Sequence, residues 1–460
     1  MGFKKNELLT LDIIDITNLG FGVAKVGGEV IFVSDTVPGD LVRAKIIKTN
    51  VSYAVARVEE YLEYSKERTE GRCDSRFCRA CAYRLLSYER ELELKHEAAK
   101  AIFKKAGLSE LEILPVTPSP KTREYRNKAQ YPVALEKSGE YSIGFFAPKS
   151  HRVTEAASCT LAPKEFERIL ELLRAHFKKH GISVYNEESG EGLLRHVYLR
   201  RAEVTGEILL TLVLNGKTIP ASDELIKILT EKEENIVGIL INVNKSDTNV
   251  ILGDEFITLY GRDHIYDVLA GVRLKITAPS FYQVNREATE LLYAKAKELA
   301  APKKDELILD LYCGAGSIGL SMAKESGEII GVEIVESAVE CAKENAGANG
   351  IGNASFYTAD AADTEKLLSR AERERGEKIK PQTVILDPPR AGSDEKLLRY
   401  IATDLAPEKI VYISCNPATL ARDMAVLTPL GYTANEVHLF DLFPGTGHVE
   451  SLVCLRRQTN

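Results

Sequence analysis

The sequence has no long hydrophobic run and no apolar leader. Nowhere do about 18 apolar residues follow one another, the length that a membrane-spanning helix needs. The first residues, MGFKKNELLT, lack the apolar core of a secretory signal. We therefore expect a cytoplasmic protein that does not associate with a membrane.

The chain also lacks an overall excess of positive charge, which at first disfavours a nucleic-acid partner. It contains 60 Lys and Arg residues and 67 Asp and Glu residues, and its net charge is -7. Residues 63–160, however, contain 18 basic and 14 acidic residues, and residues 121–152 contain 7 basic and 3 acidic ones. Such a local basic patch can bind phosphates on an acidic protein, although a solvated charged face would have the same composition.

Nothing favours a disulfide scaffold, because the eight cysteines occur in a chain without an export signal. Residues 7–60 resemble short strands separated by glycine-rich turns, which predicts a small antiparallel barrel. A helix follows, capped by Ser87 and ended by Gly107, and residues 110–280 mix helices and strands. From about residue 281, strands and helices alternate, which predicts an open, largely parallel α/β sheet.

A glycine-rich turn in this last stretch follows one strand and opens a helix. It reads DLYCGAGSIG, with Asp310 at the end of the strand and Gly314 and Gly316 in the turn. Glu333 ends the next strand, where a carboxylate can bind a ribose. A nicotinamide cofactor would also suit this pattern. Together with the later DPPR at 387–390, however, the turn resembles the class I S-adenosylmethionine methyltransferases.

Two residues near the C-terminus suggest a covalent mechanism. Cys415 follows a strand and precedes a helix, whose N-terminus would stabilise a thiolate. Glu450 lies at the start of the last strand, after the loop FPGTGHV, and is a candidate general base. Taken alone, Cys415 would more often be an inert core residue, and Glu450 could be an exposed glutamate at the start of a strand.

The ordered set of motifs resembles the RNA uracil-5-methyltransferase family, in the branch with an N-terminal TRAM domain and an iron–sulfur cluster. The resemblance covers nearly the whole chain. The motifs are GFGVAKVGGEVIFVSDTVPGD, YRNKAQ, GFFAPKSHRV, SFYQVN, DLYCGAGSIG, DPPRAG, SCNPATLARD and FPGTGHVE. This resemblance implies an α/β fold with three domains. They are an OB-like TRAM β-barrel at 1–62, a mixed α+β central domain at 63–280 and a Rossmann-like methyltransferase domain at 281–460.

The family's chemistry requires a nucleophile and a base, because carbon 5 of uracil is too weak a nucleophile to take a methyl group directly. A thiolate that adds at carbon 6 places negative charge on carbon 5, and a base later removes the proton from carbon 5. The resemblance implies that Cys415 is the nucleophile and Glu450 the base. The implied S-adenosylmethionine site comprises Gln283, Asp310, Tyr312, Gly314, Gly316, Glu333, Asp360 and Asp387. Gly445 replaces a histidine that is usual in the family.

Three cysteines in the first third, Cys73, Cys78 and Cys81, have the spacing C-x4-C-x2-C, and Cys159 follows at a distance. Thiolates at such spacing hold zinc or an iron–sulfur cluster. The resemblance implies a 4Fe–4S cluster with all four as ligands, and zinc stays the alternative.

RNA is the partner that the resemblance implies, with the target base flipped out of its stack into the enzyme. Ribosomal 23S RNA is the first choice and transfer RNA the second, and we expect a monomer. The candidate RNA contacts are Arg126, Lys128, Gln130, Lys149, His151 and Arg152. The competing functions are another class I nucleic-acid methyltransferase, which would not need Cys415, and a non-catalytic iron–sulfur RNA-binding protein.

Overall fold

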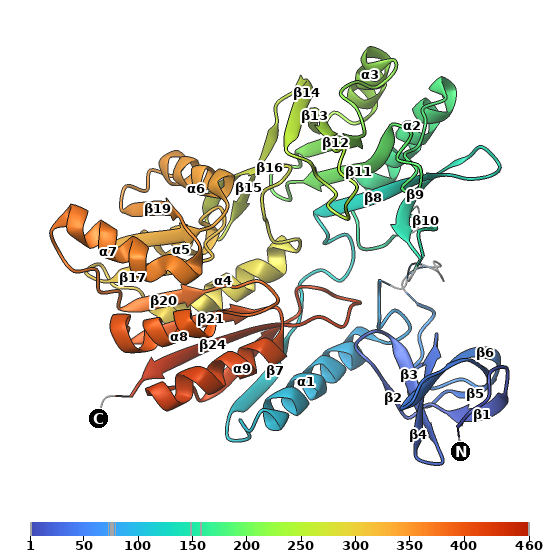
Figure 1. Ribbon diagram of the computed structural model, residues 1–460, viewed down its shortest axis with the longest axis horizontal. Coiled ribbons are helices and arrows are strands. Elements are labelled where there is room, and N and C mark those ends of the chain that lie inside the picture. The colour runs from blue at the N-terminus through green and yellow to red at the C-terminus, as the bar shows by residue number, and fades with distance from the viewer. Residues whose placement is uncertain are drawn as a thin grey trace.

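The computed structural model describes residues 2–71, 73, 78, 80–147, 150–156 and 159–458. They form three lobes that surround a central space, with the N-terminal lobe and the C-terminal lobe on opposite sides of it (Figure 1). No helix among the described residues combines the length and hydropathy needed to cross a bilayer.

The N-terminal lobe is a curved six-stranded sheet in the order β1-β5-β6-β4-β3-β2. Its strands are β1 (Leu8–Asp12), β2 (Asp15–Ile16), β3 (Phe21–Val26), β4 (Glu29–Ser34), β5 (Leu41–Thr49) and β6 (Tyr53–Glu63). Alternate residues such as Ile31, Val33 and Val42 are fully buried and form its core. The predicted purely antiparallel pairing is wrong at one place, since β4 and β6 are parallel.

Helix α1 (Tyr88–Lys105) links this lobe to the C-terminal one. Its predicted cap is confirmed, since the Ser87 side chain accepts a hydrogen bond from the backbone N–H of Arg90. The following strand, β7 (Glu112–Thr117), does not join the central lobe. It pairs in parallel with β23 (Glu436–Phe440), and so forms the edge of the C-terminal sheet.

The central lobe is a seven-stranded sheet in the order β10-β9-β8-β11-β12-β13-β14, with helices α2 (Lys164–His180) and α3 (Ser222–Lys232) packed on it. The strands are β8 (Lys128–Leu135), β9 (Tyr141–Phe146), β10 (Val153–Glu155), β11 (Leu194–Arg201), β12 (Ile208–Leu214), β13 (Ile236–Val243) and β14 (Glu255–Gly261). A hairpin of β15 (His264–Leu269) and β16 (Val272–Thr277) leads from it to the C-terminal lobe.

The C-terminal sheet runs β19-β18-β17-β20-β21-β24-β23-β7, with the short β22 (Tyr432–Thr433) beside β24. Its parallel strands are β17 (Leu307–Leu311), β18 (Glu328–Glu333), β19 (Ala354–Thr358), β20 (Thr383–Leu386) and β21 (Lys409–Ser414). Strand β24 (Glu450–Arg457) is antiparallel to β21. The helices are α4 (Arg286–Ala300), α5 (Ser317–Met322), α6 (Glu336–Ala348), α7 (Thr364–Arg375), α8 (Glu395–Tyr400) and α9 (Pro417–Leu427). The predicted alternation of strand and helix is therefore confirmed.

The loop at 441–449, between β23 and β24, reaches from the C-terminal sheet toward the N-terminal lobe (red in Figure 1). A buried ion network fixes it to α1. The ammonium of Lys95 lies 2.8 Å from the Glu91 carboxylate and 2.7 Å from that of Asp441, and all three residues are at most 1% exposed. The Glu91 carboxylate also accepts from the Gly445 N–H at 2.6 Å.

Three further segments contact the same loop. The hydroxyl of Tyr125 donates to the Pro444 carbonyl at 3.0 Å, and the Tyr83 N–H donates to the Gly445 carbonyl at 3.0 Å. At Gly447 a Cβ would lie 2.0 Å from the carbonyl oxygen of Asn18, so only glycine fits against the N-terminal lobe there. The 441–449 loop thus joins all three lobes.

Lys95→Met should destabilise the protein strongly. The change keeps an aliphatic side chain but leaves two buried carboxylates without their cation, so the free energy of unfolding should fall by about 3–5 kcal/mol. Urea unfolding followed by circular dichroism measures the loss. Lys343→Met is the matched control, because Lys343 and Glu340 form an exposed pair, and it should change stability by less than about 1 kcal/mol. Equal losses in the two variants would contradict the role of the network.

Candidate active site at the carboxyl edge of the C-terminal sheet

The carboxyl ends of five parallel strands bring most of the predicted site residues to one edge. Asp310 lies in β17, Glu333 ends β18, and Asp360 follows β19 by two residues. Asp387 directly follows β20 and Cys415 directly follows β21. Glu450 begins the antiparallel β24 and so lies at the same edge. Ligands of open α/β sheets bind at this edge.

The glycine-rich turn after β17 is shaped by its backbone. Gly314 and Gly316 have φ angles of 54° and 80°, which glycine adopts without strain. The fully buried Asp310 accepts a hydrogen bond from the Gly319 N–H at 2.9 Å through Oδ2, and its Oδ1 has no partner among the described residues. Burial raises the pKa of Asp310 to about 7. A buried acceptor without a partner is a place where a ligand donor would fit.

Glu333 is attached to the turn by its own carboxylate. Oε2 accepts from the Gly314 N–H at 3.1 Å and Oε1 from the Val335 N–H at 2.9 Å. A carboxylate has about four acceptor positions. The side chain is therefore oriented by the backbone and keeps capacity for two hydroxyl groups of a ribose.

Tyr312 has a left-handed backbone with φ 63°, which costs a non-glycine residue about 1–3 kcal/mol. Burial raises the pKa of the Tyr312 hydroxyl, and the carboxylate of Asp360 raises it further. A hydrogen bond from Ser393 acts in the opposite direction and lowers this pKa. These effects place Tyr312 beside the loop at 387–393. Strain of this kind concentrates at ligand sites.

Gln283 lies where the central and C-terminal lobes meet. Its backbone carbonyl accepts from the Asn127 side chain at 2.8 Å, and the carbonyl of Val284 accepts from the Asn127 N–H at 2.9 Å. The residue itself is buried. The predicted site residue is thus held by the YRNKAQ segment.

Cys415 and Glu450 face each other across two paired strands. Ser414 pairs with Ser451 in the antiparallel register of β21 and β24, so the next position on each strand brings Cys415 opposite Glu450. Opposite residues in such a ladder have Cα atoms about 4.5–5.5 Å apart. The sequence places these residues 35 positions apart, and only the strand pairing brings them together.

The charge around Cys415 differs from the sequence-based expectation. Burial, and then the carboxylate of Glu450, raise the pKa of the Cys415 thiol to about 11, while Arg390 lowers it. Burial also raises the pKa of Glu450 to about 8, with Asp387 acting in the same direction and Arg390 against it. Burial and the neighbouring acids therefore act against the thiolate that the helix N-terminus was expected to stabilise.

The loop that carries Arg390 is fastened to the start of α9. The Asn416 side chain donates to the Arg390 carbonyl at 3.3 Å, and the Ser393 N–H donates to Asp423 at 2.9 Å. Gly392 has φ 81°, and a Cβ there would lie 2.7 Å from the Asp423 carboxylate. Arg390 was not singled out from the sequence, although it is the fourth residue of the DPPR motif.

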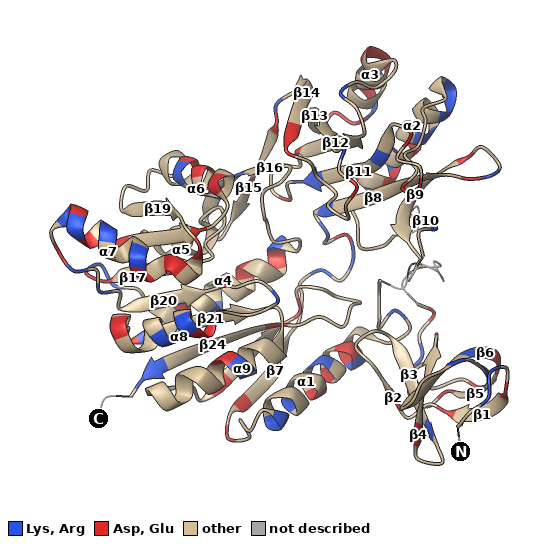
Figure 2. Ribbon diagram, viewed as in Figure 1, with Lys and Arg blue, Asp and Glu red and all other residues tan. Residues whose placement is uncertain are grey.

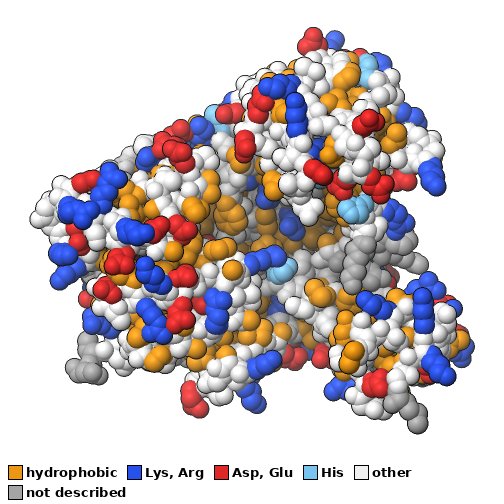
Figure 3. All heavy atoms as spheres, in the orientation of Figure 1, with side chains coloured by type: hydrophobic (Ala, Val, Ile, Leu, Met, Phe, Trp, Pro, Cys, Tyr) orange, Lys and Arg blue, Asp and Glu red, His pale blue; other side chains and the backbone are white. Residues whose placement is uncertain are grey.

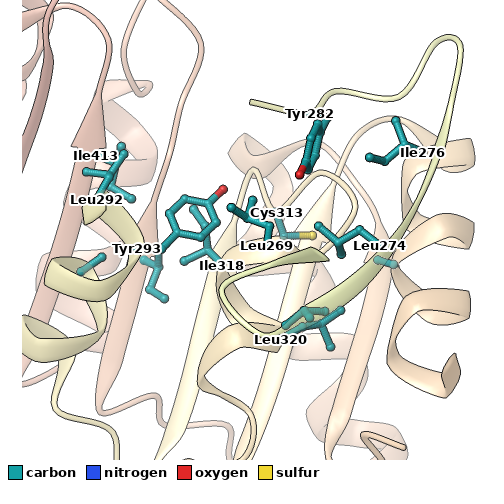
Figure 4. Packing of buried hydrophobic residues seen from close by; sticks show 14 of the residues in the cluster. Leu269, Leu274, Ile276, Tyr282, Leu292, Tyr293, Cys313, Ile318, Leu320 and Ile413 are labelled. Carbon is teal, nitrogen blue, oxygen red and sulfur yellow. The ribbon is translucent and has the colours of Figure 1, made fainter. Parts of the chain in front are cut away.

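Tyr293 of α4 is a second residue that sequence reasoning missed. Its hydroxyl lies 3.0 Å from the Ser317 hydroxyl, and its ring lies beside Ile318 (Figure 4). Burial, and then the carboxylates of Asp387, Asp310 and Glu450, raise the pKa of this hydroxyl. Acids from three strands therefore converge on one buried phenol. Burial raises the pKa of Asp387 to about 7 as well.

The space between the lobes is a hollow whose walls include hydrophobic and basic side chains (Figure 3). Lys128 begins β8 opposite Arg200 of β11, and Figure 2 shows basic segments along the central lobe. Burial, and then repulsion from Arg200 and Arg126, lower the pKa of Lys128 to about 8. Gln130, two residues further along β8, is half-buried.

The other predicted RNA contacts are placed differently. His151 and Arg152 are exposed, and His151 Nδ1 lies 2.7 Å from the Glu187 carboxylate. Lys149 lies outside the described residues.

The early cysteines lie near Arg126 or Tyr125. Burial raises the pKa of Cys78, which Cys159 and Cys73 raise further and Arg126 lowers. Cys73 and Cys159 also line a cavity of about 500 Å³ beside Tyr131. Cys81 lies close enough to influence the pKa of Tyr125. Burial lowers the pKa of His448, and Arg390, Lys95 and Arg126 lower it further.

The strand order, the glycine turn after β17 and the acids at the carboxyl edge define a class I methyltransferase. The chain belongs to the tRNA (uracil-5-)-methyltransferase family, whose model matches residues 87–458. It is an RNA methyltransferase, and the expected fold class is confirmed.

Relatives and a solved structure agree with this assignment. The chain is 39% identical over 459 residues to an uncharacterized RNA methyltransferase of Clostridium acetobutylicum, covering 99% of this chain and 98% of the relative. A relative from Listeria monocytogenes is 38% identical over 453 residues, covering 98% of each chain. The crystal structure of Pyrococcus abyssi tRNA (uracil-54, C5)-methyltransferase in complex with S-adenosyl-L-homocysteine has a TM-score of 0.76 and 28% identity, covering 97% of this chain and 99% of that one.

Glu450→Gln should stabilise the unliganded protein increasingly as the pH rises. The pKa of Glu450 is raised from about 4.5 to about 8, so the folded state holds this proton more tightly than the unfolded state. The wild type therefore loses stability as the pH rises from 4.5 to 8, and the glutamine variant lacks this loss. Melting temperatures measured from pH 5 to pH 8.5 should diverge, with the variant higher, while Glu188→Gln, at an exposed position, should keep a constant difference. Parallel curves for Glu450→Gln and wild type would contradict the burial of this acid.

Proposed function

We propose that this protein forms 5-methyluridine in RNA by covalent catalysis, with Cys415 as nucleophile and Glu450 as base. The strand register that sets these two residues opposite each other supports the proposal most directly. The acids Asp310 and Asp387 lie at the same edge of the sheet. A methyltransferase acting on nitrogen would have no use for a thiol at this position.

We propose that S-adenosylmethionine binds at the glycine turn. Glu333 would bind the ribose, and Asp310, Gly314, Gly316, Tyr312, Asp360, Gln283 and Asp387 would form the rest of the site. The Oδ1 of Asp310, which has no partner among the described residues, provides an acceptor for such a ligand, and the buried Gln283 would supply its side-chain amide. When bound, it supplies an electrophilic methyl group and a positive sulfonium charge.

In this proposal, Cys415 and Glu450 carry out different steps of the reaction. Loss of the Cys415 proton is favoured by Arg390, the cation that lowers its pKa. The thiolate adds to carbon 6 of uracil, and the electron pair of the 5,6 double bond moves toward oxygen 4. Carbon 5 then takes the methyl group. The Glu450 carboxylate removes the proton from carbon 5, the double bond re-forms, and the thiolate leaves.

A raised pKa suits Glu450 to this role. An acid with a pKa of about 8 is a stronger base at neutral pH than an exposed glutamate, although a smaller fraction of it is ionised. Asp387, which raises the pKa of both catalytic residues, lies in a loop that can line the uracil pocket.

We propose that the RNA lies in the hollow between the lobes, with its target base flipped toward Cys415. Arg126 and Lys128 would contact phosphates at the wall of the hollow and Gln130 the base, while Lys149, His151 and Arg152 would bind more distant parts. The N-terminal lobe would act as a TRAM domain, and residues 1–62, 63–280 and 281–460 as the functional divisions. Ribosomal 23S RNA is the substrate that we favour, on the combined TRAM and cluster architecture. The Pyrococcus abyssi enzyme makes transfer RNA the second candidate.

We propose a 4Fe–4S cluster on Cys73, Cys78, Cys81 and Cys159. Among the described residues, no three of these sulfur atoms lie within 4.8 Å of one another. A single zinc ion holds thiolates only about 3.8 Å apart, since Zn–S is about 2.3 Å. A cluster of four irons holds its thiolates further apart, and the family resemblance of the cysteine pattern is the ground on which we prefer it to zinc. Because methyl transfer is redox-neutral, the cluster would hold the RNA-facing Arg126 segment rather than carry electrons.

Protein purified without oxygen should be brown and contain about four irons and four sulfides per chain. Cys159→Ser should lose the colour and most of the iron, because it removes one of four ligands. Cys341→Ser, at a buried cysteine in α6, is the control and should keep both. Zinc in place of iron in wild-type protein would refute the iron–sulfur assignment.

The catalytic assignment predicts that variants of Cys415 and of Glu450 stop at different steps of the reaction. Cys415→Ala should abolish methylation and all covalent attachment to RNA. Glu450→Gln should add and methylate the uracil but fail to eliminate the thiol, so it should accumulate protein linked to methylated RNA. A denaturing gel with radiolabelled S-adenosylmethionine detects the linked band, with 23S RNA fragments and transfer RNA transcripts tested side by side.

Cys454→Ala is the matched control, since this thiol lies on β24 four residues beyond Glu450. It should turn over normally and give no stable band. Normal turnover by Glu450→Gln, or a covalent protein–RNA band from Cys415→Ala, would contradict the proposed mechanism. The transcript that yields the band identifies the RNA substrate.

A further inference from the structure

A second cluster of ligand-type side chains lies on the two helices of the central lobe. The C-terminal end of α2 meets the first turn of α3 at the outer edge of the molecule (Figure 1). There His176, His180 and Glu224 each offer a ligand atom, and these atoms all lie within 4.8 Å of one another. Among the described residues, no other three side chains of His, Cys, Asp or Glu bring their ligand atoms this close together.

The imidazole of His176 is buried and uses only one of its two ring nitrogens in a hydrogen bond to the described residues. It is 3% exposed, and its Nε2 lies 3.2 Å from the carbonyl oxygen of Pro220. A carbonyl only accepts, so Nε2 carries the proton and Nδ1 keeps its lone pair. Nδ1 is buried and has no partner among the described residues. Histidines that bind metals commonly donate their other N–H to a backbone carbonyl in this way.

His180 and Glu224 are already spaced as two ligands of one ion. His180 Nε2 lies 3.2 Å from Glu224 Oε2. Two ligands at about 2.0–2.1 Å from a tetrahedral zinc ion lie about 3.3 Å apart. The other oxygen of Glu224 is held by the Lys179 ammonium at 2.6 Å, which leaves Oε2 for the ion.

The helices themselves favour a cation here. His176 and His180 are four residues apart, so they project from the same face of α2, and their ring centroids are 4.5 Å apart. The C-terminus of a helix carries partial negative charge, which attracts a cation. Only a small closure of the His176 ring, by up to about 1.5 Å, would bring all three atoms to zinc distances.

We propose that His176, His180 and Glu224 bind a divalent transition metal of the zinc class, with water as the fourth ligand, and that this ion fastens α2 to α3. Two imidazoles and a carboxylate suit zinc better than calcium or magnesium, which prefer oxygen ligands alone. The site is separate from the methyl-transfer residues and does not depend on the proposed function.

Zinc titration of the full-length protein tests the site. Zinc should raise the melting temperature of the wild type by at least about 2 °C at saturating concentration. His180→Ala and Glu224→Gln should each weaken zinc affinity at least about tenfold, measured by calorimetry, and should lose the rise in melting temperature. RNA methylation should be unchanged in both variants.

His264→Ala is the matched control, since His264 pairs with Asp263 without a third ligand and should keep wild-type affinity. Cobalt is the spectroscopic probe, because thiolate ligands give an intense charge-transfer band that imidazole and carboxylate do not. Wild-type zinc affinity in both variants would overturn the proposal. So would a cobalt spectrum that shows only the thiolate band, which would assign the metal to the early cysteines.

Discussion

The buried ammonium of Lys95 is the interaction on which the arrangement of the three lobes depends. It neutralises carboxylates from α1 and from the end of β23, two segments separated by 346 positions in the chain. The 441–449 loop that it fixes touches Asn18, Tyr83 and Tyr125 and ends at Glu450. Since a buried charge is tolerated only when it is paired, the network permits one position of this loop, and with it one position of the carboxylate opposite Cys415.

The candidate site brings together several buried acids, and burying their ionised carboxylates destabilises the folded protein. Asp310, Asp387 and Glu450 all have pKa values raised by burial, and Arg390 is a cation that lowers the pKa of both Cys415 and Glu450. Such a site is poorly satisfied without its ligands. Functional sites of enzymes commonly trade stability for reactivity in this way. A positively charged co-substrate suits this surplus of buried acid.

The sequence was sufficient for local features and insufficient for those that depend on pairing between distant segments. The glycine turn, the cap at Ser87 and the strand before Cys415 follow from short patterns, and each is present in the structure. No pattern could show that β7 joins the C-terminal sheet, because periodicity predicts a strand but not its neighbour. Arg390 was missed for the same reason, since its place beside Cys415 depends on contacts of its loop with Asn416 and Asp423. The thiol's raised pKa followed from burial, which the sequence does not reveal.

The pairing of β7 with β23 has a consequence for how the chain is made. Glu112 of β7 lies opposite Glu436 of β23, so the strand's partner is synthesised 324 residues later. At about 5–20 residues per second, a ribosome needs roughly 16–65 s to reach it. Throughout that interval β7 lacks its one strand partner and the Lys95 network lacks its Asp441 carboxylate. The segment that carries α1 and β7 therefore cannot complete its contacts until nearly the whole chain has been made.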